Sequence, residues 1–148
     1  MTDPHVYSGL INLGNTCFIA VSIQLITTHE QMRKVILDKK NHTTCNEQSC
    51  FICGFRHLIL NMKQEKAFNP SRIVQALKMK KRNEFPVDSH DTFMQCDAHE
   101  CLLILLDYIN QEIQPLGQID ECLFFETNTT MTCETCGAFN EISEKNYG

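Results

Sequence analysis

A cysteine at the start of a predicted helix is the first residue whose setting could do chemistry. Cys17 follows a turn-rich segment, Gly9–Thr16, and opens an apolar stretch that predicts a helix to about Thr28. A thiol attacks only as the thiolate, and the partial positive charge at a helix N-terminus favours that anion. Asn12 could donate an amide N–H to a developing oxyanion, an interaction worth about 3–4 kcal/mol in a transition state. A cysteine taken alone is more often a small buried residue, so both interpretations stay open at this point.

Four potential metal ligands lie close together, with the spacing His42-x2-Cys45-x4-Cys50-x2-Cys53. Imidazole and thiolate groups in this number are usual ligands of tetrahedral zinc. A metal would also order a segment, 41–53, that is polar and is predicted to be a loop. Free thiols are the alternative. We expect a structural zinc ion here.

A later pair of cysteines, Cys133-x2-Cys136, has the spacing of half a zinc knuckle. A complete knuckle needs two more ligands, and Cys122 is the one candidate nearby. A redox-active pair is the alternative interpretation, but such a pair favours a strand-to-helix setting that the residues after Cys136 do not supply. Cys133 and Cys136 are expected to be zinc ligands as half of a knuckle, for which no second CxxC pair follows within residues 137–148.

Two acidic side chains, Asp97 and Glu100, are spaced i, i+3 on a predicted helix and should share one side of it. An acidic surface beside the Cys17 thiol would suit a basic peptide. A solvated helix face is the alternative. His99, between the two acids, is expected to be structural or exposed rather than a catalytic base.

The composition excludes several classes of protein. The 148 residues are 43% hydrophobic and 21% charged, as in a soluble globular domain. A formal charge of −5 argues against nucleic acid as a direct partner. The longest apolar run, Leu102–Leu106, is too short to span a membrane, and residues 1–8 lack the apolar core of a signal peptide. The nine cysteines are an odd number and no export signal is evident, so we expect an intracellular protein, in the nucleus or the cytoplasm, whose cysteines do not form a disulfide framework.

The hydrophobic pattern predicts a chain that begins with helices and ends with strands. Apolar residues at helical spacing predict helices over about 17–28, 55–62, 70–80 and 95–113. Asn69 is expected to cap the third of these, with Pro70 as its first residue. Cys101 falls on the apolar stripe of the fourth and is expected in the core. Short strands are expected at 122–125, 128–132 and 139–142.

Two segments resemble motifs of the ubiquitin-specific proteases. They are Gly9-Leu10-Ile11-Asn12-Leu13-Gly14-Asn15-Thr16-Cys17-Phe18 with Gln24, similar to the cysteine box, and Gln95-Cys96-Asp97-Ala98-His99-Glu100-Cys101-Leu102, similar to the second box. The resemblance implies an α+β fold of the papain-like cysteine peptidases, with the helical thumb over about 9–117 and the start of the β fingers over about 118–148. Departures from the family pattern stand at Ala20, Val21, Cys96 and Cys101.

The same resemblance implies a deubiquitinase in which Cys17 attacks the carbonyl of ubiquitin's C-terminal glycine and Asn12 helps to hold the oxyanion. It also implies that Asp97 and Glu100 hold the arginine-containing tail of ubiquitin. The family's histidine base belongs to a later segment, so the resemblance covers less than half of a catalytic domain and the chain alone is expected to be inactive. Two alternatives stay open, a ubiquitin-binding pseudoenzyme without turnover and a zinc-stabilised interaction domain.

The cysteine-rich insertion at 42–53 is similar to one in the branch that contains the histone-deubiquitinating enzyme of the SAGA coactivator. This likeness places the chain nearest that branch. It implies structural zinc, ubiquitin or a ubiquitinated protein as substrate, and a multi-subunit chromatin complex as a further partner.

Overall fold

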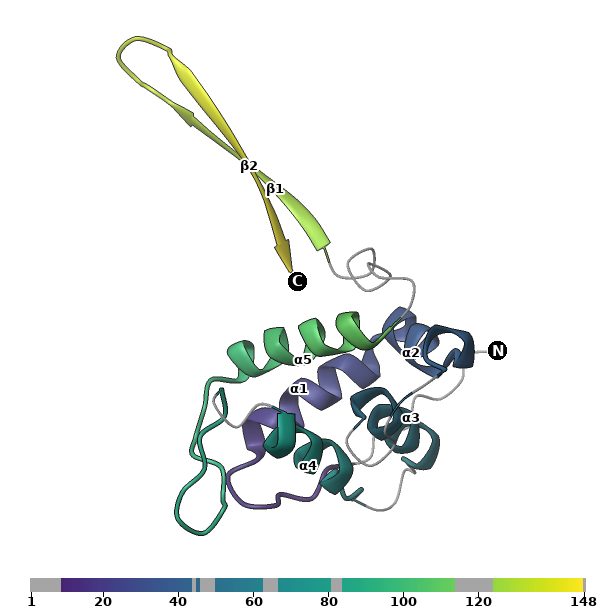
Figure 1. Ribbon diagram of the computed structural model, residues 1–148. Helices are drawn as coiled ribbons and strands as arrows, with labels where there is room; N and C mark the ends of the chain where they lie inside the picture. Colours follow the sequence, from purple (N-terminus) through teal and green to yellow (C-terminus); the bar gives the residue numbers. More distant parts are fainter. Residues whose placement is uncertain are drawn as a thin grey trace.

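The computed structural model describes residues 9–43, 45, 50–62, 67–80, 84–113 and 124–147, which form a group of helices followed by a β-hairpin (Figure 1). The elements are α1 Cys17–Thr28, α2 Glu30–Leu37, the 3-10 helix η1 Lys39–Asn41, α3 Phe51–Asn61, α4 Ser71–Lys80, α5 Ala98–Glu112, β1 Phe124–Thr132 and β2 Phe139–Tyr147. This order is the expected partial α+β fold, helical first and β later. The expected boundary at about residue 117 lies outside the described residues.

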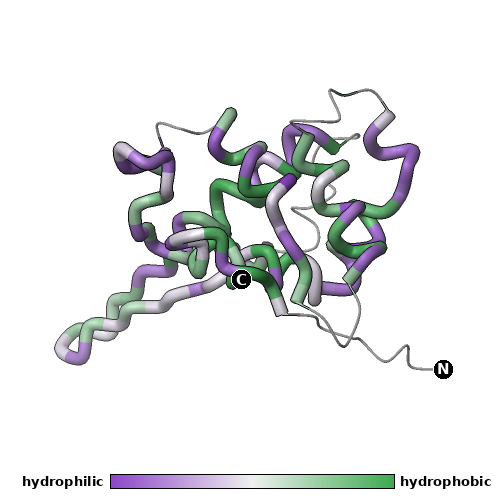
Figure 2. Tube along the Cα trace, turned by 90° about the horizontal axis from the view of Figure 1, so that it is seen from below, coloured by the Kyte–Doolittle hydropathy of each residue, from purple (hydrophilic) through white to green (hydrophobic). Residues whose placement is uncertain are grey.

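The core lies between α1, α5 and the helices packed beside them. α1 packs along α5, and α3 contacts α2, α4 and α5 (Figure 1). Hydrophobic segments gather among the helices, as Figure 2 shows, because each helix turns its apolar stripe toward its neighbours. The largest fully buried side chains include Phe51, Phe55, Phe85, Phe93, Ile19 and Ile23. None of the described helices is long and apolar enough to cross a membrane.

The starts of two helices differ from the prediction because of capping. α5 was expected from about Gln95, but it begins at Ala98, since Asp97 adopts an extended backbone and its side chain accepts hydrogen bonds from His99 N and Glu100 N. α4 was expected to open with Pro70, but it begins at Ser71, whose N–H donates to Asn69 Oδ1 at 3.0 Å. An N-cap side chain fixes where the helical backbone begins, and hydrophobic spacing alone does not locate it.

The predicted loop over 41–53 is shorter than expected. Asn41 closes η1, and α3 begins at Phe51, so that Cys53 lies in the first turn of a helix. The Cys50 thiol is the reason for this early start, because its Sγ accepts a hydrogen bond from Cys53 N at 3.3 Å and so caps α3. The apolar stripe of α3 was predicted correctly from Phe55 onward.

The hairpin joins β1 and β2 in an antiparallel ladder that runs from the pair Phe124–Tyr147 to the pair Thr132–Phe139. In the described residues, two longer strands form where three short strands were predicted, and Cys122 lies outside these residues. The tight turn at 133–138 is closed by hydrogen bonds from Cys133 N to Ala138 O and from Gly137 N to Cys133 O. Gly137 has φ +70°, a backbone conformation that favours glycine. The hairpin extends beyond the helices (Figure 1).

Candidate active site and metal centre

Cys17 is the first residue of α1, and its side chain is exposed. The neighbouring residues Phe18 and Ile19 are buried, so α1 presents the thiol on one side while its other side packs in the core. The interpretation of Cys17 as a small buried residue is therefore wrong. Within the described residues, no hydrogen bond joins the Cys17 thiol to a histidine ring.

The loop before Cys17 is organised by the side chain of Asn12. Its Oδ1 accepts hydrogen bonds from Gly14 N at 3.1 Å, from Thr16 N at 3.2 Å and from Thr16 Oγ1 at 3.0 Å. All three bonds use the carbonyl oxygen of the amide, so the Asn12 NH₂ group takes part in none of them. The Asn12 side chain is exposed, so its NH₂ group can donate a hydrogen bond to an acceptor on a bound molecule.

Thr16 occupies the N-cap position of α1, but its hydroxyl does not cap the helix. The hydroxyl instead donates to Asn12 Oδ1 and accepts from Leu13 N at 2.9 Å. Gly14, with φ +94°, allows the loop to pass close to the neighbouring loop, since a Cβ there would lie 3.0 Å from Thr92 Cγ2. The loop thus leaves the first turn of α1 without a side-chain cap, beside the exposed Cys17.

The two motif-bearing helices are joined directly. Ser22 is buried in α1, and its Oγ donates to Phe18 O at 2.9 Å and to Ala98 O at 3.1 Å. This second bond connects α1 to the beginning of α5, where the second motif lies. The sequence analysis missed this bond, although a hydroxyl among apolar residues of a helix needs a partner once it is buried and was a usable signal.

Asp97 has a local role that the sequence analysis missed. Its Oδ1 accepts from His99 N at 2.8 Å and from Glu100 N at 3.0 Å, so it is the N-cap of α5 rather than part of the helix surface. These N–H groups, that of Glu100 first, lower the pKa of the Asp97 carboxyl. Glu100 lies exposed in the first turn of α5. The signal was present, because an Asp followed three residues later by Glu is a typical helix start.

Cys101 packs in the core as predicted. It is 0% exposed, and burial raises the pKa of its thiol to about 11. The nearby Cys96 is half-buried, and burial also raises its pKa. His99 lies between Asp97 and Cys101 in the sequence and is exposed, in agreement with its expected structural or surface role.

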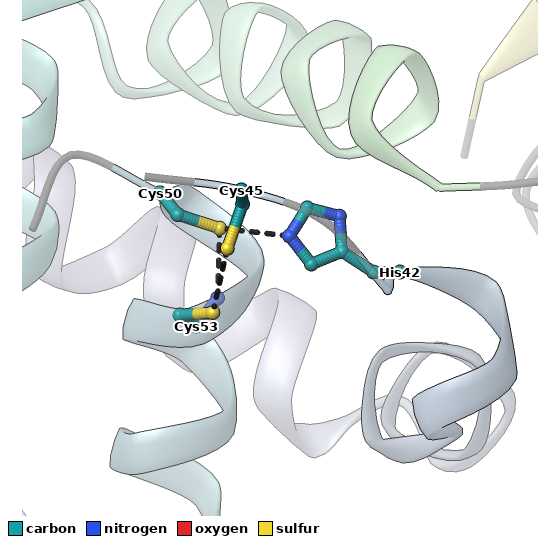
Figure 3. A group of neighbouring side chains, drawn as sticks. All are labelled: His42, Cys45, Cys50 and Cys53. Atoms are coloured by element: carbon teal, nitrogen blue, oxygen red, sulfur yellow. Dashed lines mark hydrogen bonds between the residues drawn. The ribbon is translucent and has the colours of Figure 1, made fainter. Parts of the chain in front are cut away.

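The four predicted metal ligands come together in one cluster. The candidate ligand atoms of His42, Cys45, Cys50 and Cys53 all lie within 4.8 Å of one another. Figure 3 shows the side chains pointing toward a common centre, with His42 and Cys45 on the segment after η1 and the other two at the start of α3. Cys50 Sγ lies 3.1 Å from His42 Nε2, and Cys45 Sγ lies 3.4 Å from Cys53 Sγ.

This cluster fits a tetrahedral metal. Zinc bonds of about 2.0–2.3 Å place ligand atoms about 3.5–3.8 Å apart, and the separations of 3.1 Å, 3.4 Å and at most 4.8 Å bracket that range. Burial raises the pKa values of the Cys50 and Cys53 thiols, which disfavours uncompensated thiolates at this place. A divalent cation would supply the missing positive charge. The donor set of three sulfurs and one imidazole nitrogen is one that zinc prefers.

Two residues outside the ligand set hold the cluster in place. The guanidinium of Arg56 donates to Ile36 O, to Asp38 O and to His42 O, which fastens the His42 segment to α2 and α3. Glu112, near the end of α5, accepts from His42 Nδ1 through its main-chain carbonyl at 2.8 Å. Neither residue was predicted, because both lie outside the local spacing pattern.

Cys133 and Cys136 lie together at the exposed hairpin turn. The backbone N–H groups of Cys136 and Thr135 donate toward the Cys133 thiol and lower its pKa. This is the local geometry that half a metal knuckle needs. Within the described residues, no third ligand joins them to form a group like the one around His42.

Comparison with known proteins identifies the family. The model of the ubiquitin carboxyl-terminal hydrolase family matches residues 8–139. The chain is 31% identical over 106 residues to "Probable ubiquitin carboxyl-terminal hydrolase 16" of Schizosaccharomyces pombe, covering 67% of this chain and 22% of the relative. It is 26% identical over 140 residues to "Ubiquitin carboxyl-terminal hydrolase 6" of the same organism, covering 93% of this chain and 27% of the relative.

A solved structure shares the fold. The chain matches one chain of "Structure of the SAGA Ubp8/Sgf11/Sus1/Sgf73 DUB module bound to ubiquitin aldehyde" with a TM-score of 0.71 and 17% identity, covering 95% of this chain and 34% of that chain. The chain therefore spans about a quarter to a third of the length of these known proteins. With the family model matching residues 8–139 and the fold shared with a solved structure, the chain belongs to the ubiquitin carboxyl-terminal hydrolase family, as its two motifs predicted.

Proposed function

We propose that the chain provides the nucleophile side of a deubiquitinase, a thiol hydrolase that cleaves the bond after the C-terminal glycine of ubiquitin. The observation that carries this proposal is the arrangement around Cys17. The thiol is exposed at the first residue of α1, next to a loop that is organised by Asn12 and leaves the Asn12 NH₂ group outside its own bonds. Family membership supplies the substrate class.

In the proposed reaction, the Cys17 thiolate attacks the carbonyl carbon of the terminal glycine, and the carbonyl oxygen gains the negative charge. The Asn12 NH₂ group donates a hydrogen bond to that oxyanion, which stabilises the transition state more than the ground state. The thiol proton must pass to a base. No histidine in the described part of the chain is bonded to the Cys17 thiol, so we expect the base outside these residues and no useful turnover by the 148 residues alone.

Asp97 and Glu100 are the proposed binding residues for the basic tail of ubiquitin. Both carboxyl groups are exposed at the start of α5, and Ser22 bonds this start to the helix that carries Cys17. Asp97 has two roles in this proposal, because its Oδ1 caps α5 while its charge faces solvent. Asp97→Asn is therefore the informative variant, since asparagine keeps a side-chain oxygen that can cap α5 and lacks the charge.

A mechanism-based ubiquitin probe with a C-terminal electrophile tests the proposal. Mass spectrometry of the zinc-supplied chain should find one ubiquitin adduct on Cys17, and Cys17→Ala should abolish it. Cys133→Ala is the matched control, because that thiol is equally exposed but lies at the hairpin turn. A folded chain that forms no adduct contradicts a live nucleophile.

Ubiquitin binding without an adduct would favour the alternative of a non-catalytic ubiquitin-binding pseudoenzyme. Labelled ubiquitin titrated against the chain measures this directly. Binding that weakens in Asp97→Asn and in Glu100→Gln assigns the tail contact to the start of α5. Zinc binding without any affinity for ubiquitin would instead favour a zinc-stabilised interaction domain.

We also propose that zinc is the metal held by His42, Cys45, Cys50 and Cys53, where it stabilises the junction of α2, α3 and α5. The fit of the ligand distances and the donor set support this identity. Elemental analysis of purified chain should find zinc, and Cys50→Ser should remove most of it. For Cys133 and Cys136, zinc is expected only with further ligands, so Cys136→Ser should leave the zinc content of the isolated chain unchanged.

The remaining proposals concern setting. The fold shared with a chain of a SAGA module supports, by analogy alone, a place in a multi-subunit chromatin complex. Nuclear or cytoplasmic residence agrees with the many free cysteines. Subcellular fractionation and affinity purification of the tagged chain test both, and recovery in a secreted fraction would contradict the second.

A further inference from the structure

The end of α5 touches the metal cluster at more than one atom. The main-chain oxygen of Glu112 lies 2.8 Å from His42 Nδ1, and its carboxylate Oε2 lies 3.4 Å from Cys50 Sγ and 3.4 Å from Ile52 N. These contacts join residues about 60 to 70 positions apart in the sequence. Glu112 of α5 is therefore in contact with the two predicted ligands His42 and Cys50 and with the start of α3.

The carbonyl contact determines which nitrogen of His42 can bind a metal. A carbonyl oxygen only accepts hydrogen bonds, so Nδ1 must carry the hydrogen. In the neutral ring the lone pair is then on Nε2, and Nε2 is the atom that faces Cys50 Sγ at 3.1 Å. Ligand histidines commonly donate their other N–H to such an acceptor, which fixes both the tautomer and the orientation of the ring.

The carboxylate contact acts on the start of α3. Ile52 is the second residue of this 11-residue helix, so a carboxylate beside its N–H lies at the positive end of the helix dipole. Cys50, the N-cap of the same helix, is a ligand. Through the Ile52 N–H, Glu112 therefore holds in place the turn that presents Cys50 and Cys53, whereas the hydrogen bond that the Cys50 thiol donates to Oε2 is lost when Cys50 binds a metal as the thiolate.

We propose that Glu112 is a positioning residue of the metal centre, and that metal binding in turn fastens the C-terminal end of α5. This proposal rests on the zinc site proposed above. The metal fixes the His42 ring, the ring fixes the Glu112 carbonyl, and the last turn of α5 loses its freedom to fray. Because the other end of α5 carries Asp97 and Glu100, the metal centre and the proposed ubiquitin contact share one rigid helix.

The first experiment is a two-bond ¹H–¹⁵N spectrum of the histidine rings in the zinc-loaded chain at neutral pH. We expect zinc on His42 Nε2 with the hydrogen on Nδ1. Zinc on Nδ1, or no zinc on the ring, overturns the proposal. Elemental analysis of the same sample separates the two hypotheses, because a chain that binds no zinc refutes the zinc site itself and this inference with it.

The second experiment is hydrogen exchange at the amides of Gln111, Glu112 and Ile113. Zinc should slow their exchange by about fivefold or more in the wild-type chain, the effect of one fixed hydrogen bond. His42→Cys offers a fourth sulfur ligand but no N–H for the Glu112 carbonyl. Zinc-loaded His42→Cys should lack the slowing at these amides, and equal slowing in this variant overturns the proposal.

Side-chain variants test the carboxylate separately. Glu112→Ala should weaken Co²⁺ binding by about tenfold or more, while Glu112→Gln, which keeps an acceptor for Ile52 N, should restore most of the affinity. The matched control is Gln111→Ala. Gln111 lies on the same turn, it is exposed, and within the described residues its side chain bonds only to Asp107. A Co²⁺ affinity that is unchanged in Glu112→Ala contradicts the positioning role of the carboxylate.

Discussion

Substitutions of Asn12 can separate its structural role in the loop from its proposed role as an oxyanion donor. Its Oδ1 accepts three hydrogen bonds within the loop, one of them exposed and two half-buried. A bond of this kind contributes about 0.5–1.5 kcal/mol net, so loss of the two half-buried bonds in Asn12→Ala should lower the free energy of unfolding by about 1–3 kcal/mol, and the exposed bond adds little. Asn12→Asp keeps the oxygen that accepts these bonds and should leave the fold close to wild type. What it loses is the N–H donor.

Thermal unfolding of the zinc-supplied chain, followed by circular dichroism, measures the first effect. The expected loss in Asn12→Ala corresponds to a fall in Tm of roughly 2–12 °C, and the Tm of Asn12→Asp should fall by much less. The second effect is measured in a form of the protein that hydrolyses ubiquitin conjugates. There, Asn12→Asp should reduce the hydrolysis rate of a ubiquitin conjugate by about 10²–10³-fold, the usual effect of losing one oxyanion donor.

Two results would refute this reasoning. If Asn12→Ala unfolds at the wild-type temperature, the three bonds do not organise the loop. If Asn12→Asp retains full hydrolysis in a competent enzyme, the amide N–H is not an oxyanion donor. Asn15→Ala is a useful control, because Asn15 lies in the same loop with an exposed side chain, although its φ of +50° adds some backbone strain of its own.

Three further predictions concern stability and reactivity. Arg56→Met should lower the free energy of unfolding by about 2–4 kcal/mol, because three main-chain carbonyls lose a charged donor, and urea denaturation measures it. The lowered pKa of Asp97 contributes stability above the unfolded-state value of about 3.9, and that stability is lost as the pH falls through the folded-state pKa; the Tm difference between wild type and Asp97→Asn should therefore shrink below about pH 4, whereas a constant difference contradicts it. Maleimide at pH 8 should label Cys17 in the folded chain but leave Cys101 unlabelled until denaturant is added, because Cys101 is buried with a pKa of about 11; labelling of both at equal rates counts against this burial.

The helices were predictable where an apolar stripe is continuous. Helix α1 ends at Thr28 as expected, since the chain turns at His29, whose extended backbone and ring nitrogen start α2, a helix that was not predicted. The start of α5 was placed too early, because the polar residues before Ala98 fit a helical spacing while the Asp97 side chain decides where the helix begins. Hydrophobic spacing reports burial, and only capping geometry reports the boundary.

The metal cluster was predictable because its four ligands all lie within residues 42–53 of the sequence. The contacts that hold it were not. Arg56 reaches back to Ile36, and Glu112 reaches across to His42, over separations where no local pattern links the two residues. Folding brings such partners together through the packing of whole helices, so their identity follows from tertiary structure rather than from spacing.

The hairpin leaves two sheet edges available. β1 and β2 pair only with each other in the described residues, so each strand has one row of main-chain donors and acceptors that no strand covers. A further strand could extend the sheet by pairing with either edge. The same edges allow two molecules to join strand to strand at high concentration. Charged side chains such as Glu126, Glu144 and Lys145 oppose this association, so concentrated samples should stay dispersed longer in low salt than in high salt.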